Sequence, residues 1–322
     1  MKIRRWIVRR EPNWKQLDAL LQQIEQRGVQ SLSADEIQLL ASLYRSVSAD
    51  LARARTQQLG EALIRDLQLL TTRGYNQIYQ GSRRQEWRAV VQFYRWGLPA
   101  TIQQTWPYIA VATGIFGVGM LVSWWFAWQD PAFMALVVPQ ELIEKVRDDQ
   151  ELWMGSILGN EPLASSGIMV NNLVVSFRAI AGGISCGAFT TYVLALNGVM
   201  IGAIATLVGQ NGLAGPFWAF VLPHGSLELP AIFFAGGAGL LLGRALLFPA
   251  PYRRADALKV YGGQAARLTF GLIPMLVIAG IIEGFFSPNP AIPDLAKYIV
   301  GIVLFVLLLL YCNLQPPRNL KT

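Results

Sequence analysis

The chain of 322 residues has one histidine, two cysteines and few charged side chains. Charged residues make up 15% of the sequence, against roughly 25% in soluble domains, whereas hydrophobic residues make up 53%. This composition excludes an ordinary soluble protein. A single histidine also excludes a zinc site made from several imidazoles of one chain. Cys186 and Cys312 both fall in apolar stretches, where free cysteine behaves as a small buried hydrophobe, so we expect them to serve packing.

The scarce charges are unevenly distributed along the chain. Residues 1–105 contain sixteen of the 27 Lys and Arg residues, and long apolar blocks follow. Because crossing a hydrocarbon core of about 30 Å takes roughly 20 apolar residues, each block is long enough for a span. The sequence therefore predicts an all-α, polytopic membrane protein with about six transmembrane helices and an N-terminal cytoplasmic helical domain. We attribute its pI of about 9.6 to topology and anionic lipid, and expect no nucleic-acid partner and no cofactor.

The hydropathy and charge pattern divides the chain into five segments. They are a cytoplasmic helical domain (1–105), a first transmembrane helix (106–128), an extracytoplasmic loop subdomain (129–170), a transmembrane core (171–315) and a cytoplasmic tail (316–322). Loops rich in Lys and Arg stay in the cytoplasm, whereas residues 129–170 contain seven acidic residues. The N-terminus is therefore expected in the cytoplasm.

The N-terminal domain reads as a series of helices. In "LSADEIQLL", Ser33 is the expected N-cap of a helix, and Glu36 at the third helical position completes a capping box. Two more helices are expected near 60–79 and 83–98. The second of these combines arginines with aromatic residues, which fits either a helix on the inner membrane surface or a bundle helix with a basic solvated face.

Residues 171–210 are long enough for two spans folded back on each other. We place their turn at Asn197 and Gly198, because glycine accepts a positive φ. The later spans are expected within 216–247, at 267–286 and at 295–313. In the alternative, 171–210 is one tilted or re-entrant segment, the chain has five spans, and the C-terminus lies outside.

The only histidine lies in an apolar stretch. His224 precedes Glu228 by one helical turn in "VLPHGSLELPAIFF". The expected topology places both residues in the outer half of the bilayer, together with Arg178 and Glu283. Because a charge at mid-membrane costs about 2.5–3.5 kcal/mol, we expect Arg178 to pair with Glu228, with Glu283 as the competing partner. This cluster serves either as an interhelical lock or as a functional polar site.

His224 and Glu228 also form half of a zinc ligand set. At i and i+4 both side chains share one helix face. A zinc site needs three or four protein ligands, and the chain has no second histidine, so we expect no metal here.

Three stretches resemble a known family. They are "LSADEIQLLASLYRSVSADLARAR", "NNLVVSFRAIAGGISCGAFTTYVLALNGVMIGAI" and "LPHGSLELPAIFFAGGAGLLLG". In these stretches the chain resembles the stage II sporulation protein M family of bacterial inner-membrane proteins. The family's signature positions fall here at Asn171, Asn172, Asn197, Gly198, His224, Gly225, Glu228 and Pro230.

In spore formers this resemblance implies a membrane scaffold that works with peptidoglycan-degrading partners during engulfment, and not an enzyme. The long N-terminal domain departs from the short sporulation member. It is similar to the broader branch of the family, found in bacteria that do not sporulate.

These features lead to three functional expectations. The leading one is a non-enzymatic scaffold or partner-recruiting protein of the bacterial inner membrane, active in organising or remodelling the cell envelope. Its expected partners are the lipid bilayer, unidentified envelope proteins and a second copy, joined through small-residue helix faces. The alternative is a transporter or lipid-handling protein that uses a polar site around His224 and Glu228. The third is an intramembrane metal-dependent hydrolase.

Overall fold

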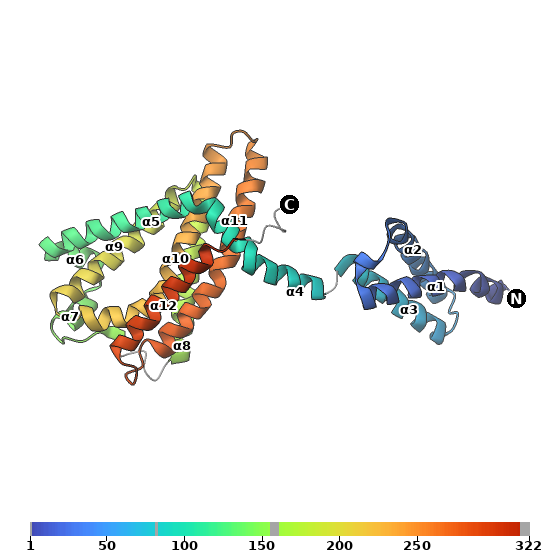
Figure 1. Cartoon of the computed structure of the whole chain (residues 1–322), viewed down its shortest axis with the longest axis horizontal. Coiled ribbons are helices and arrows are strands. Elements are labelled where there is room, and N and C mark those ends of the chain that lie inside the picture. Colours follow the sequence, from blue (N-terminus) through green and yellow to red (C-terminus); the bar gives the residue numbers. More distant parts are fainter. Residues whose placement is uncertain (1, 81–82, 155–160, 316–322) are drawn as a thin grey trace. The chain divides into compact units, whose positions relative to one another are not determined.

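The computed structural model describes residues 2–80, 83–154 and 161–315. Its regular structure in these segments consists of helices, which confirms the all-α fold class (Figure 1). The chain divides into two compact units, Met1–Gln92 and Phe93–Thr322, which are described separately below. The tail expected over 316–322 lies outside the described residues.

The first unit is a small helical domain with its own hydrophobic core. It contains α1 (Lys2–Arg27), α2 (Ala34–Thr56), α3 (Glu61–Tyr75) and α4 (Arg83–Gln92). Fully buried side chains from the first three helices form the centre of the core: Leu17, Leu21, Val47 and Leu67. An N-terminal helical region ahead of the spans is thereby confirmed.

The capping box expected at the start of α2 is present. The Ser33 hydroxyl accepts a hydrogen bond from the Glu36 backbone N–H, and the Glu36 carboxylate accepts one from the Ser33 backbone N–H at 2.7 Å. Hydrogen bonds from the backbone and then the hydroxyl of Ser33 lower the pKa of Glu36, because they stabilise its ionised form.

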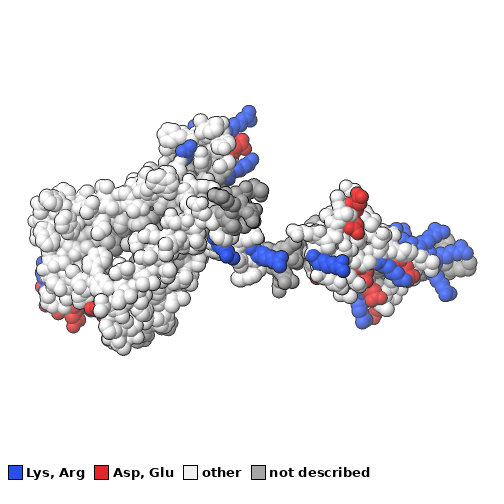
Figure 2. All heavy atoms as spheres, in the orientation of Figure 1, with Lys and Arg blue, Asp and Glu red and all other residues white. Residues whose placement is uncertain are grey.

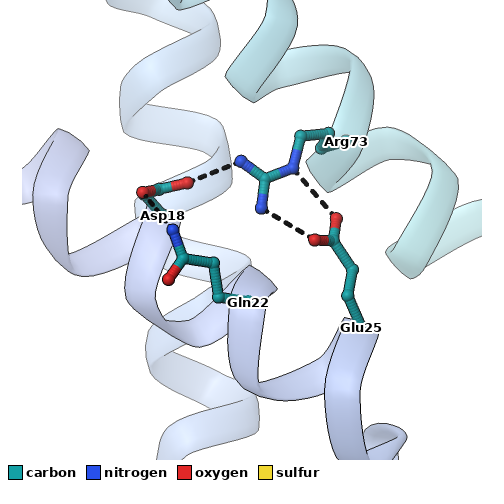
Figure 3. Close-up of polar contacts among 4 residues, drawn as sticks. All are labelled: Asp18, Gln22, Glu25 and Arg73. Carbon is teal, nitrogen blue, oxygen red and sulfur yellow. Dashed lines mark hydrogen bonds and ion pairs between the residues drawn. The ribbon is translucent and has the colours of Figure 1, made fainter.

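Arg73 joins α3 to α1 (Figure 3). Its Nε and Nη2 donate to the two oxygens of Glu25 at 2.9 Å each, and its Nη1 donates to Asp18 at 2.5 Å. Asp18 also accepts from Gln22 of its own helix. The hydrogen bonds to Glu25 are the main cause of a raised pKa of Arg73. A bidentate contact of this kind constrains the orientation of the two side chains as well as their distance, so it constrains how α1 and α3 pack.

Helix α4 leaves apolar side chains uncovered. Trp87, Val90 and Val91 are exposed, although α4 also carries arginines. This pattern favours the first alternative for the segment, a helix on a membrane surface.

The second unit contains the membrane spans. Within the described segments, six helices are long and apolar enough to cross a membrane, which confirms the six-span expectation. They contain α5 (Leu98–Gln129), α8 (Glu161–Ala181), α9 (Ala188–Gln210), α10 (Ala214–Leu247), α11 (Arg254–Ile281) and α12 (Asp294–Cys312). Two short helices, α6 (Pro131–Val137) and α7 (Gln140–Arg147), follow α5. Figure 2 shows this unit almost free of charge on the visible face, apart from groups near α7 and near the turn between α10 and α11.

Two of the spans begin earlier than expected. Helix α5 begins at Leu98 and α8 at Glu161, ahead of the starts expected at residues 106 and 171. Pro99 lies in the first turn of α5, where proline needs no backbone hydrogen bond and favours the start of a helix. Apolar composition alone therefore underestimates the length of these two helices, because each helix extends beyond its apolar block into flanking polar residues.

The turn between the second and third spans also differs from the expectation. Helix α8 is followed by η5 (Gly182–Ser185), and the chain reverses at Cys186 and Gly187, whose φ angles are 58° and 89°. The turn expected at Asn197 and Gly198 is wrong, because both residues lie inside α9. Cys186 is exposed in the turn, so its expected packing role is wrong as well.

Gly198 instead lets α9 pack closely on α5. A Cβ atom added at Gly198 would collide with the carbonyl oxygen of Phe116, and one added at Gly202 would collide with that of Met120. Small residues at such crossings allow backbones of membrane helices to approach closely.

Helix α10 is the central element of the unit. It contacts α5, α8, α9, α11 and α12. Its 34 residues would measure about 51 Å if straight, which exceeds the membrane core of about 30 Å. The helix contains Pro223 and Pro230, which each remove a helix hydrogen bond. Figure 1 shows that α10 changes direction along its length.

Replacing Gly198 by leucine is expected to destabilise the second unit, because the new side chain must separate α5 from α9. We expect a loss of about 2–3 kcal/mol, measured as a lower melting temperature of the full-length protein in detergent. Gly117→Leu on α5 is the control, since a Cβ added there meets nothing within 4 Å. Equal melting temperatures of the two variants would contradict the close crossing.

Candidate functional site

Three ionisable side chains meet where α10 passes the end of α11. His224 and Glu228 lie on α10, and Glu283 lies in η6 (Ile282–Phe286), the π-helical continuation of α11. One nitrogen of His224 and one oxygen of each glutamate all lie within 4.8 Å of one another. Among these atoms, His224 Nε2 lies 3.8 Å from Glu283 Oε1. The structure therefore groups Glu283 with the pair on α10.

His224 is held on its other side by Ser287. Its Nδ1 lies 3.2 Å from the Ser287 hydroxyl, and the Phe220 ring meets the imidazole edge-on with the ring centres 5.2 Å apart. When Nδ1 carries the proton and donates to Ser287, Nε2 presents its lone pair toward Glu283. Sequence reasoning missed Ser287, although its position four residues after Glu283 on a helical segment was a usable signal.

Glu228 and Glu283 have different surroundings. The Asn172 side chain on α8 interacts with the carboxylate of Glu228, and Asn172 itself accepts a hydrogen bond from the exposed Asn171 at 3.4 Å. In Glu283, Oε2 is buried and has no hydrogen-bond partner within the described part of the chain. One carboxylate oxygen is therefore available to a bound group.

His224, Glu228 and Glu283 line a partly enclosed cavity of about 390 Å³. Its other walls come from α5, α9, the start of α10 and the segment after α7. They are formed largely by apolar and aromatic side chains: Phe116, Met120, Trp153, Ile201, Ile204 and Phe217. A few polar groups that converge in an otherwise apolar cavity are typical of ligand-binding sites.

Arg178 does not join the cluster. It lies in the last turn of α8 with an exposed side chain, and it forms no ion pair with any described acidic residue. The expected pair of Arg178 and Glu228 is therefore wrong. Because α8 begins at Glu161, Arg178 lies about 25 Å along the helix, whereas a start at Asn171 would have put it at about 10 Å. Asn172 is the α8 residue that reaches Glu228.

The remaining predicted positions lie around or away from the cluster. Gly225 is buried on α10 and lines the cavity. Pro230 lines a separate apolar cavity of about 370 Å³ between α10 and α12. Asn197 donates its side-chain amide to the Val193 carbonyl within α9 at 2.7 Å, and Gly198 faces α5. The structure thus brings His224, Glu228, Glu283 and Asn172 together and leaves the others outside.

Replacing Glu283 by glutamine is expected to stabilise the protein at pH 9, where both carboxyl groups can ionise, in the presence of a chelator. The change removes one of two facing carboxylates from an apolar setting, and we expect a gain of about 1–2 kcal/mol. The measurement is the melting temperature in detergent with EDTA. Arg178→Gln is the control and should shift stability by less than about 0.5 kcal/mol. A destabilised Glu283→Gln variant would contradict the repulsion.

Each of the two units matches a known family model. The family model "Stage II sporulation protein M" matches residues 112–288, and the model "Domain of unknown function (DUF8413)" matches residues 4–80. Two similar chains come from Methanocaldococcus jannaschii. "Uncharacterized protein MJ0793" is 29% identical over 129 residues, which cover 38% of this chain and 71% of the relative. "Uncharacterized protein MJ0706" is 28% identical over 101 residues, which cover 30% of this chain and 45% of the relative. No solved structure matches significantly.

Proposed function

We propose that this chain, which belongs to the stage II sporulation protein M family, transports a small cation, because its histidine meets two glutamates beside a cavity among the spans. The convergence of His224, Glu228 and Glu283 on this cavity carries the proposal. Ionisable residues at membrane depth are costly, and they commonly mark ion and substrate pathways.

The charge around the cavity favours a cation over an anion. Two carboxylates face it, and no Lys or Arg of the described segments forms an ion pair with either. The stretch that leads to Trp153, which lines the cavity, carries five acidic residues against Lys145 and Arg147: Glu141, Glu144, Asp148, Asp149 and Glu151. Negative charge beside an opening raises the local concentration of cations.

The packing of the cluster favours a binding site over an interhelical lock. A lock is expected to be dry and fully paired, whereas Glu283 Oε2 has no described partner and a cavity adjoins it. Helix α10 is continuous, but Pro223 and Pro230 each leave a backbone carbonyl without its helical hydrogen bond. A non-enzymatic role agrees with Ser226, whose hydroxyl donates to the Pro223 carbonyl at 2.9 Å and is not held by His224.

Glu228→Gln is expected to stop transport and leave the fold intact. The purified protein in liposomes is tested against a panel of H⁺, Na⁺, K⁺, Mg²⁺, Mn²⁺ and Zn²⁺, with indicator dyes inside the vesicles. We expect wild type to move at least one of these ions and Glu228→Gln to lose at least about 90% of that rate, since the site loses a charge that the ion needs. Arg178→Gln should retain the rate. No flux of any of the six ions in wild type would overturn the proposal.

A scaffold of the cell envelope is the second candidate. It is favoured by Met1–Gln92, which forms a compact unit with its own core and matches a domain model of its own. Such a unit offers a surface for protein partners. In this proposal the protein lies in a bacterial inner membrane with this unit in the cytoplasm, and it associates with a second copy and with envelope proteins.

Complementation separates the two candidates. In a deletion strain with a measurable envelope defect, a folded Glu228→Gln variant is expected to fail to restore the wild-type phenotype if transport is the function. A scaffold predicts full restoration, because the substitution leaves the surface of residues 1–92 unchanged. The control is wild type expressed at the same level, verified by immunoblotting of membranes.

A further inference from the structure

The cluster of His224, Glu228 and Glu283 has the composition of a metal-ion site. It joins one imidazole nitrogen to two carboxylates, which come from two separate helical segments. The two glutamates bring two carboxyl groups into an apolar region, and neither has a described Lys or Arg within 4.0 Å. A bound divalent cation would take the place of protons on these groups and balance the charge of both carboxylates.

The geometry points to a divalent transition-metal ion of the Zn²⁺ class, and we propose that His224 Nε2 and one oxygen each of Glu228 and Glu283 bind it. Bonds of about 2.0–2.2 Å in a tetrahedron hold ligand atoms about 3.3 Å apart. The observed separation of 3.8 Å between His224 and Glu283, and the limit of 4.8 Å for the whole set, approach that value. Small side-chain rotations close the difference.

The choice of ions follows from the donor atoms. Ca²⁺ and Mg²⁺ prefer six or more oxygen ligands, whereas an imidazole suits Zn²⁺, Cu²⁺, Fe²⁺ and Ni²⁺. Three protein ligands leave a coordination position open, and the adjoining cavity can supply water or a second ligand to it. An open site of this kind exchanges its ion more readily than a closed four-ligand site, which suits a transported ion.

Ser287 contacts the proposed ligand His224, and Asn172 contacts the proposed ligand Glu228, without binding the ion themselves. Metal-binding histidines usually hydrogen-bond through their other ring nitrogen, which fixes the tautomer and the ring orientation. His224 Nδ1 has this contact with the buried Ser287. Asn172 occupies the equivalent position beside Glu228. Both are positioning residues that act through a ligand.

This inference rests on the proposed function, since it names the cation class that the same site would carry. Binding is measured on the full-length, tag-free protein by equilibrium dialysis with Zn²⁺ after treatment with EDTA. Both cysteines are replaced by serine (C186S, C312S), so that thiols do not bind the ion. We expect one equivalent of Zn²⁺ per chain, and visible absorption of bound Co²⁺ that indicates four or five ligands.

Single substitutions distinguish the residues that bind the ion from the residues that position a ligand. His224→Gln and Glu283→Gln are expected to weaken Zn²⁺ binding at least 100-fold, and Ser287→Ala about 10-fold, within the range for residues behind a ligand. Glu144→Gln on α7, an exposed acidic residue outside the cluster, is the control and should bind as wild type does. The wild type should also gain thermal stability from Zn²⁺, and the His224→Gln variant should not.

Less than about one tenth of an equivalent of Zn²⁺, or equal binding by wild type and His224→Gln, would overturn the metal site. The outcome is independent of flux. Binding that needs His224 without transport by liposomes would support the site and overturn the transporter. Transport of another cation without binding of Zn²⁺ would do the reverse.

Discussion

Burying ionisable side chains among membrane helices imposes the constraint on which the second unit depends. Lipid offers no hydrogen bonds, so each polar group of His224, Glu228 and Glu283 must be met by protein, by water in a cavity or by a bound ion. The surrounding helices meet part of this requirement through Ser287 and Asn172. One oxygen of Glu283 has no hydrogen-bond partner among the described residues, and a cavity adjoins it, so this part of the requirement is not met by those helices. An architectural role alone gives no reason to leave such a group uncovered.

Close packing around α10 makes this arrangement possible. A Cβ added at Gly239 would collide with the backbone of α8, and one added at Gly243 would collide with the turn at Cys186. The absence of side chains on this part of α10 therefore fixes its later half against its neighbours. The earlier half carries the prolines, the histidine and the glutamate beside the cavity. One helix thus combines a tightly packed anchor with a segment that lines a site.

The sequence predicted the fold class, the six spans and the capping box of Ser33 and Glu36, because each depends on local composition and spacing. It misplaced the turn after the second span, because both Asn197-Gly198 and the glycines at 182–187 permit a reversal, and only packing on α5 and α10 selects between them. That error, together with the late start assigned to α8, put Arg178 at the wrong depth. Glu283 was expected in this cluster as a competing partner of Arg178, but its contact with His224 was not predicted, because hydropathy does not specify how residues on different helices approach each other.

The positions that the resemblance to the family assigned in this chain separate into two physical groups by their packing in the structure. Gly198 serves helix packing, and any protein with this fold would need a small residue there. His224, Glu228 and Asn172 have no such role, because apolar residues of similar volume would fill the same space without the cost of burying polar groups. The structure retains them beside a cavity and adds Glu283 from another helix. Their combination supports the proposed ligand, which needs nitrogen and carboxylate donors together, and the scaffold role proposed for residues 1–92 is compatible with it on the same chain.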